Sequence, residues 1–167
     1  MHAARLFLII GLSLVLSPAV GDSLLLDTNH RDWAQLGELS RSRHIPVVIL
    51  VTDEDCGYCE RLKEEVLLPM AREGRLEGRA LVRELSMRTG GKLLDFDGER
   101  IRARIFLGRY NIFASPTLLF LDAAGHALHK PLIGYNGRDE YSSLLLEALD
   151  KSLSGMAPSD VAGNADG

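Results

Sequence analysis

Cysteine is scarce in this chain of 167 residues, which holds only two, Cys56 and Cys59. A metal site needs further soft ligands, and the histidines show no ligand spacing, so the pair predicts no metal site. Glu60 rather than histidine follows Cys59, which excludes c-type haem attachment. A purely structural disulfide across so short a loop would add little stability. Redox chemistry is the interpretation that these exclusions favour.

A large excess of charge of either sign is also lacking. The chain carries 19 Lys and Arg against 23 Asp and Glu, for a formal net charge of −4. Nothing in this balance favours nucleic acid or an anionic membrane, so we expect no nucleic-acid partner. The content of 46% hydrophobic and 25% charged residues is typical of a globular protein. The length predicts one domain of ordinary size.

The apolar run near the N-terminus, residues 6–16, is shorter than the ~20 residues that a membrane-spanning helix needs. Arg5 precedes this run, and Pro18 follows it, before the small residues Ala19-Val20-Gly21. This order is typical of a secretory signal peptide. We therefore expect residues 1–21 to be a signal peptide and the protein to be periplasmic or secreted. The alternatives are an uncleaved anchor and a buried first helix.

The two cysteines lie between a strand pattern at residues 45–51 and a helical pattern at residues 60–72. The strand pattern has no polar alternation, which predicts burial on both faces. The N–H groups and dipole of a helix N-terminus stabilise a thiolate on the first cysteine. The second cysteine, one turn later, can attack a mixed disulfide. The stretch therefore predicts a redox-active dithiol, with Cys56 exposed and Cys59 buried by the helix.

The remaining patterns predict an α/β domain at residues 32–153, after a linker at 22–31 and before a disordered tail at 154–167. Pro69 should kink or end the helix of residues 60–72. Residues 87–99 are rich in turn formers and predict a surface loop. Further helices are expected at residues 32–42 (capped by Asp32), 101–110 (with Ile105 facing inward) and 139–149 (with Leu144 facing inward). Further strands are expected at residues 80–85, 113–122 and 129–135.

Cys56 and Cys59 after a strand, Ser115-Pro116-Thr117 at a strand start, and Gly134 after the last strand together resemble the thioredoxin fold. This resemblance covers about residues 32–151 and implies a central mixed β-sheet flanked by helices. Residues 95–110, with PTLLFLDAAG and IGYNGRDEY, look most like the exported SoxW-type thioredoxin-like proteins. The string VTDEDCGYC is also similar to the catalytic domain of the DsbC disulfide isomerases.

The resemblance implies roles for individual residues. Cys56 matches the attacking nucleophile, and Cys59 matches the resolving thiol. Pro116 matches the cis proline that faces the disulfide, and Ser115 would offer backbone groups to an extended substrate. The alternative for Pro116 is an ordinary trans proline at the start of an edge strand. The substrate-binding residues expected on this basis are Gly57, Tyr58, Ser115, Pro116 and Gly134.

The sequence also departs from its relatives. Leu50 stands six residues before Cys56, where cytosolic thioredoxins carry a buried aspartate that helps proton transfer. Asp53 lies nearer and is a candidate proton relay, although it could equally cap the helix or face solvent. DsbC-type enzymes have a separate dimerisation domain, for which this chain has no residues. We therefore rank isomerase activity lower and expect a monomer.

Acidic residues crowd the cysteines: Asp53, Glu54, Asp55 and Glu60, with Arg61 as the nearest cation. Negative neighbours disfavour a thiolate, which makes a dithiol a better reductant, although exposed charges are screened. The sequence thus predicts an exported thiol–disulfide oxidoreductase that mainly reduces protein disulfides. It would need no cofactor and would take electrons from a membrane thiol donor. The alternatives are a disulfide oxidase or isomerase and a non-catalytic binding module of the same fold.

Overall fold

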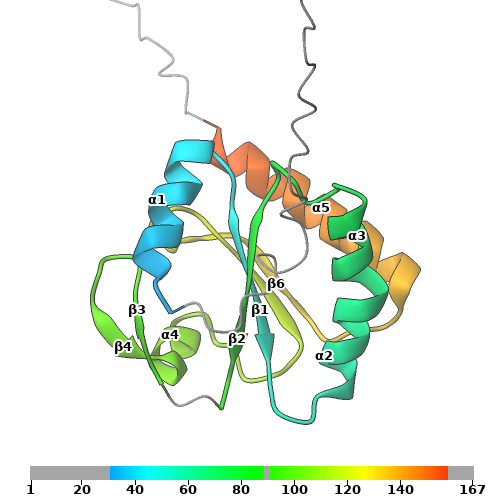
Figure 1. Cartoon of the computed structure of the whole chain (residues 1–167), viewed down its shortest axis with the longest axis horizontal. Coiled ribbons are helices and arrows are strands. Elements are labelled where there is room, and N and C mark those ends of the chain that lie inside the picture. The colour runs from blue at the N-terminus through cyan, green and yellow to red at the C-terminus, as the bar shows by residue number, and fades with distance from the viewer. Residues whose placement is uncertain (1–30, 89–90, 158–167) are drawn as a thin grey trace, which may run out of the picture.

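The computed structural model describes residues 31–88 and 91–157. Its centre is a four-stranded sheet in the order β2-β1-β5-β6, with helices on both faces (Figure 1). β1 pairs in parallel with β2 and antiparallel with β5, and β5 pairs antiparallel with β6. These strands are β1 (Val47–Thr52), β2 (Leu81–Ser86), β5 (Thr117–Leu121) and β6 (Ala127–Ile133). The predicted central mixed sheet flanked by helices is confirmed.

The helices form two layers around this sheet. On one side lie α2 (Gly57–Leu62), α3 (Leu68–Arg72) and α5 (Arg138–Met156), and on the other lie α1 (Trp33–Arg43) and α4 (Ala103–Arg109) (Figure 1). The side chain of Asp32 caps α1 by accepting the N–H of Gln35, as predicted. Among the described residues, no helix is long and apolar enough to cross a membrane.

Strand β1 is the centre of both hydrophobic cores, and all six of its residues are buried. Ile49 belongs to the core with Trp33 and Phe106, whose rings stack 5.9 Å apart. Leu50 belongs to the core on the opposite face, with Leu62 of α2. Successive side chains of a strand point to opposite faces, so an unbroken apolar run suits a strand covered on both sides. The predicted burial of this strand on both faces is confirmed.

The helix after the cysteines begins at Gly57, three residues earlier than expected, and Pro69 does not end it. A π-helical turn, Lys63–Leu67, precedes α3, and the N–H of Leu68 donates to the carbonyl of Lys63. Proline has no N–H to donate, so the regular hydrogen-bond pattern is interrupted at Pro69 in any case. The wider turn changes the hydrogen-bond register there, and the helical path continues to Arg72.

Residues 87–99 are not simply a surface loop, and this expectation was wrong. They include β3 (Lys92–Leu94), which pairs antiparallel with β4 (Arg100–Arg102), and they bury Leu93 and Asp95. Because Ile101 belongs to β4, α4 begins only at Ala103. The inward face of α4 is therefore Ala103, Phe106 and Leu107, and Ile105 is exposed, contrary to the prediction.

The last helix, α5, continues to Met156, so residues 154–156 are helical rather than part of a disordered tail. Ser152 is fully buried, and Leu153 packs against the core, which extends the helix beyond its predicted end at Leu149. Leu144 is exposed, contrary to the prediction. The expected signal peptide, nearly all of the expected linker and residues 158–167 of the expected tail lie outside the described residues.

Candidate active site

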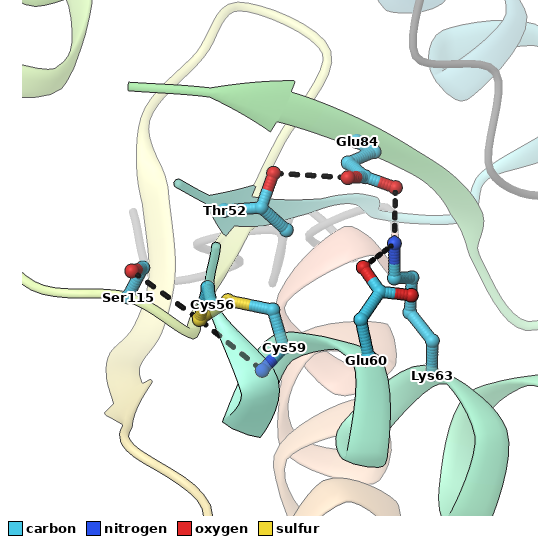
Figure 2. A network of polar contacts seen from close by, with 7 residues as sticks. All are labelled: Thr52, Cys56, Cys59, Glu60, Lys63, Glu84 and Ser115. Carbon is cyan, nitrogen blue, oxygen red and sulfur yellow. Dashed lines mark hydrogen bonds and ion pairs between the residues drawn. A yellow bond between two sulfur atoms is a disulfide. The ribbon is translucent and has the colours of Figure 1, made fainter. Parts of the chain in front are cut away.

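The two cysteines form a disulfide at the N-terminus of α2, with sulfurs 2.05 Å and Cα atoms 5.2 Å apart (Figure 2). Cys56 is the N-cap residue of this helix, and its Sγ accepts the N–H of Cys59 at 3.2 Å. The same N–H and the helix dipole stabilise negative charge on Cys56 when the disulfide is reduced. The placement expected from the sequence is therefore present.

The two sulfurs differ in their access to solvent. Cys56 is half-buried, whereas Cys59 is only 1% exposed. Cys59 lies on the helical face that also buries Leu62, Val66 and Met70, because these residues recur every three or four positions. This confirms the predicted face. An incoming group can reach Cys56 but not Cys59, so the geometry separates an attacking sulfur from a resolving one.

The sheet brings a distant segment against Cys56. Val51 near the end of β1 pairs with Thr117 at the start of β5. The residues before Thr117 therefore lie at the same end of these central strands as the cysteines. The Ser115–Pro116 peptide bond is cis, which agrees with the resemblance. The Ser115 hydroxyl donates to Cys56 Sγ at 3.6 Å (Figure 2). This side-chain contact was not anticipated, since the sequence suggested only a backbone role for Ser115.

The other expected substrate-binding residues lie at the same end of the sheet. The N–H of Gly134 donates to the carbonyl of Pro116 at 2.8 Å, which places Gly134 beside the proline. Gly57 and Tyr58 are the exposed first residues of α2, between the cysteines. The structure therefore gathers all five residues, and their part in binding substrate stays a prediction.

Asp53 is already engaged by other groups. Its Oδ1 accepts the N–H of Glu54 at 2.9 Å and lies 2.9 Å from Nε of Arg88. Arg88 also approaches Glu54 at 3.6 Å, so this arginine offsets part of the acidic loop. Arg61, the nearest cation in sequence, instead pairs with Glu65 one turn further along, at 2.9 Å. The relay role of Asp53 stays a prediction.

A buried polar network that the sequence analysis missed lies under α2. Glu84 on β2 is 7% exposed, and its Oε1 accepts a hydrogen bond of 2.9 Å from the Thr52 hydroxyl. Lys63 Nζ lies 3.5 Å from Oε2 of Glu84 and 2.7 Å from Oε1 of Glu60 (Figure 2). Burial alone lowers the pKa of Lys63, but its bond with Glu60 and the charges of both glutamates outweigh burial and raise its pKa. The available signal was a glutamate on the strand face that also carries Ala80 and Val82, since alternate residues share a face and carboxylates are rarely buried without a partner.

Metal ligands do not gather in the part of the chain that the structure describes. Within residues 31–88 and 91–157, no three His, Cys, Asp or Glu side chains are grouped so that they could hold a metal ion.

Comparisons with known proteins place this geometry in a family. No functionally curated protein matches the chain. Among solved structures, it is similar to the oxidised C-terminal domain of DsbD from Neisseria meningitidis, at 15% identity, covering 69% of this chain and 90% of that one, with a TM-score of 0.49. It is also similar to the reduced periplasmic thioredoxin SoxS from Paracoccus pantotrophus, at 23% identity, covering 64% and 98% of the two chains, with a TM-score of 0.42.

A poplar thioredoxin h is a third such structure, at 16% identity, covering 69% of this chain and 86% of its own, with a TM-score of 0.48. The more specific resemblance to SoxW-type proteins stays a prediction. The model of the thioredoxin-like domain family matches residues 37–149, which include both cysteines, Ser115 and Pro116. Because this match spans more than half of the sequence, the chain belongs to the thioredoxin-like domain family.

Proposed function

We propose that this protein is an exported thiol–disulfide oxidoreductase that mainly reduces disulfides of other proteins. The thioredoxin-like fold with its Cys56–Cys59 pair supports thiol–disulfide chemistry. The single observation that carries the proposal is the asymmetry of the disulfide, with Cys56 accessible at a helix N-terminus and Cys59 buried behind it. Export rests on the signal-peptide pattern of residues 1–21.

The proposed reaction is a two-step exchange. In the reduced protein, the Cys56 thiolate attacks one sulfur of a substrate disulfide, and the other substrate sulfur leaves as a thiolate that takes up a proton. Cys59 then loses its proton and attacks Cys56 Sγ, which releases the second substrate thiol and forms the disulfide seen here. Two electrons have passed from the dithiol to the substrate. A thiol donor, which we propose to be a membrane protein, must return two electrons.

Exposed apolar side chains support a protein substrate. Phe113 is 77% exposed two residues before Ser115, and Ile133 is 64% exposed directly before Gly134. Tyr58, between the cysteines, is 60% exposed. Exposed large apolar groups at a site favour contact with another protein surface.

The charges around the disulfide support the reducing direction. Five carboxylates belong to the site or its buried network, and the ion pairs seen among the described residues join four of them to two cations, Lys63 and Arg88. This surplus of negative charge disfavours a thiolate on Cys56, and a less stabilised reduced form makes a stronger reductant. The five carboxylates are Asp53, Glu54, Asp55, Glu60 and Glu84.

The test is a pair of cysteine variants in an assay of protein-disulfide reduction with dithiothreitol as the electron source. Cys56→Ser should abolish turnover, and Cys59→Ser should accumulate a mixed disulfide with the substrate. Turnover of the Cys56→Ser variant near the wild-type rate would refute the proposal.

The reduction potential of the pair decides the direction. A value of about −270 mV would support a reductase, whereas a value of about −120 mV would identify an oxidant. If a variant with both cysteines replaced by serine kept its biological role, the protein would instead be a binding module.

A further inference from the structure

Resolution of the mixed disulfide requires Cys59 to lose a proton while it is shielded from solvent. At 1% exposure, the Cys59 thiol has little direct contact with bulk water, and burial disfavours an ionised sulfur. Leu50, on the adjacent part of β1, has no group that accepts a proton. The reaction proposed above therefore needs an acceptor from another element.

The position beside Leu50 holds a carboxylate. Glu84 is the direct partner of Leu50 in the parallel pairing of β1 with β2. It bonds to Thr52, two residues after Leu50 and therefore on the same face of β1. That face carries α2, so Glu84 lies on the same side of the sheet as Cys59.

The contact with Lys63 also places Glu84 beside α2, at the point where the π-helical turn begins. Lys63 is one turn after Cys59, and its backbone N–H donates to the carbonyl of Cys59. Residues four apart on a helix are neighbours on one face. Figure 2 shows the contacts that run from Thr52 through Glu84 and Lys63 to Glu60, the residue after Cys59.

Glu84 retains capacity to accept a proton or a hydrogen bond. A carboxylate offers about four acceptor positions. The Thr52 hydroxyl occupies one on Oε1, and Lys63 stands 3.5 Å from Oε2, beyond ordinary hydrogen-bond length. The closer partner of Lys63 is Glu60, at 2.7 Å. Asp53, by contrast, follows β1 and is held by Arg88 and the N–H of Glu54.

We propose that Glu84 is the buried carboxylate that takes up the Cys59 proton when Cys59 attacks the mixed disulfide. The proton moves from the Cys59 thiol to Glu84, directly or over one water molecule, and returns to solvent after the substrate thiolate has left. The bond from Cys59 Sγ to Cys56 Sγ forms as the bond from Cys56 Sγ to the substrate sulfur breaks. The charged groups that pair with Glu84 in the structure are Lys63 directly and Glu60 through Lys63. This inference rests on the proposed function.

The experiment separates attack from resolution with dithiobis(nitrobenzoate) and the reduced full-length protein. Attack by Cys56 releases a first coloured nitrobenzoate thiolate, and resolution by Cys59 releases a second. This leaving group has a low pKa and needs no proton, so the second phase reports the loss of the Cys59 proton. We expect Glu84→Gln to slow the second phase by about tenfold or more near pH 7, with the first phase nearly unchanged. The rate of its second phase should rise with pH more steeply than that of the wild type, because solvent must then take the proton.

Two control variants distinguish a proton acceptor from a structural group. Glu64→Gln removes an exposed carboxylate next to Lys63 and should leave both phases unchanged. Glu84→Gln combined with Lys63→Met removes both members of the ion pair, and so removes the lysine charge that only Glu60 would balance in the single variant. The second phase should stay slow in this double variant, which also carries the test if the single variant does not fold.

The other possible outcomes would refute either the role of Glu84 or the proposed function. Wild-type resolution and pH dependence in Glu84→Gln, equal slowing in Glu64→Gln, or recovery in the double variant would each overturn the role of Glu84 and leave the proposed function standing. Slowing by Asp53→Asn but not by Glu84→Gln would assign the proton to Asp53 instead. Failure of wild-type protein to release even the first thiolate would refute the proposed function itself.

Discussion

The contact between the Ser115 hydroxyl and Cys56 Sγ predicts that this hydroxyl shifts the reduction potential of the cysteine pair. Its Oγ donates to Cys56 Sγ at 3.6 Å in the disulfide form. The sulfur becomes a thiolate on reduction, and hydrogen bonds to charged groups contribute about 1.5–3 kcal/mol against about 0.5–1.5 kcal/mol for neutral ones. Because 3.6 Å is long, we take a small difference between the two states, about 1 kcal/mol.

Ser115→Ala removes this preference for the reduced form. A loss of about 1 kcal/mol corresponds to a potential more negative by about 20 mV and to an equilibrium constant changed about fivefold. The N–H of Cys59, 3.2 Å from the same sulfur, remains in the variant and limits the effect. The variant should therefore be a modestly stronger reductant than the wild type.

The measurement is a titration of the Cys56–Cys59 pair in buffers of reduced and oxidised dithiothreitol. Ser115→Thr retains a hydroxyl and is the matched control, with a potential close to that of the wild type. An unchanged or less negative potential in Ser115→Ala would show that the hydroxyl does not stabilise the thiolate. The same shift in Ser115→Thr would show that packing, and not the hydroxyl, sets the potential.

Four further predictions concern stability, measured as the free energy of unfolding in urea. Gly37→Ala should destabilise the protein by about 1–3 kcal/mol, because a Cβ there would meet a backbone carbonyl oxygen 2.5 Å away. Gly108→Ala, also within a helix but facing open space, should stabilise it by about 1 kcal/mol, so equal effects would contradict both. Arg109→Ala should cost about 2 kcal/mol, since it leaves buried Asp95 without its ion-pair partner, although the N–H of Phe96 still donates to Asp95; no loss would mean that the pair is solvated. Burial and the charge of Asp95 raise the pKa of Tyr110 to about 12. The neutral Tyr110 side chain therefore contributes its full share of the free energy of unfolding below about pH 10, and this share is lost as pH rises toward 12. Tyr110→Phe should flatten that decline, and an equally steep decline would contradict the assignment.

Local sequence determined the elements whose signals lie within a few residues. The unbroken apolar run at residues 45–51 predicted a strand buried on both faces, because only a strand covered on both sides buries consecutive side chains. The spacing of Cys56 and Cys59 before a helical pattern predicted an accessible sulfur and a buried one. Both predictions rest on the side-chain directions within a single strand or helix, which do not depend on distant parts of the chain.

The sequence misled where a pattern was short or its partner distant. The hairpin of β3 and β4 was missed because three-residue strands hardly differ from turns in sequence, and their pairing depends on each other. The inward assignment of Ile105 failed for the same reason, since β4 delays the start of α4 and rotates its buried face.

Tertiary structure alone decided which charges surround the disulfide. Sequence proximity pointed to Arg61, but the fold pairs Arg61 with Glu65 and brings Arg88 to Asp53 instead. Glu84 reaches Thr52 across 32 positions of sequence, and only the parallel pairing of β2 with β1 places it there. The dithiol was thus evident from the sequence, because its chemistry lies within four consecutive residues. Its electrostatic surroundings were not, because interactions between charges depend on distances in space, and the sheet sets those distances.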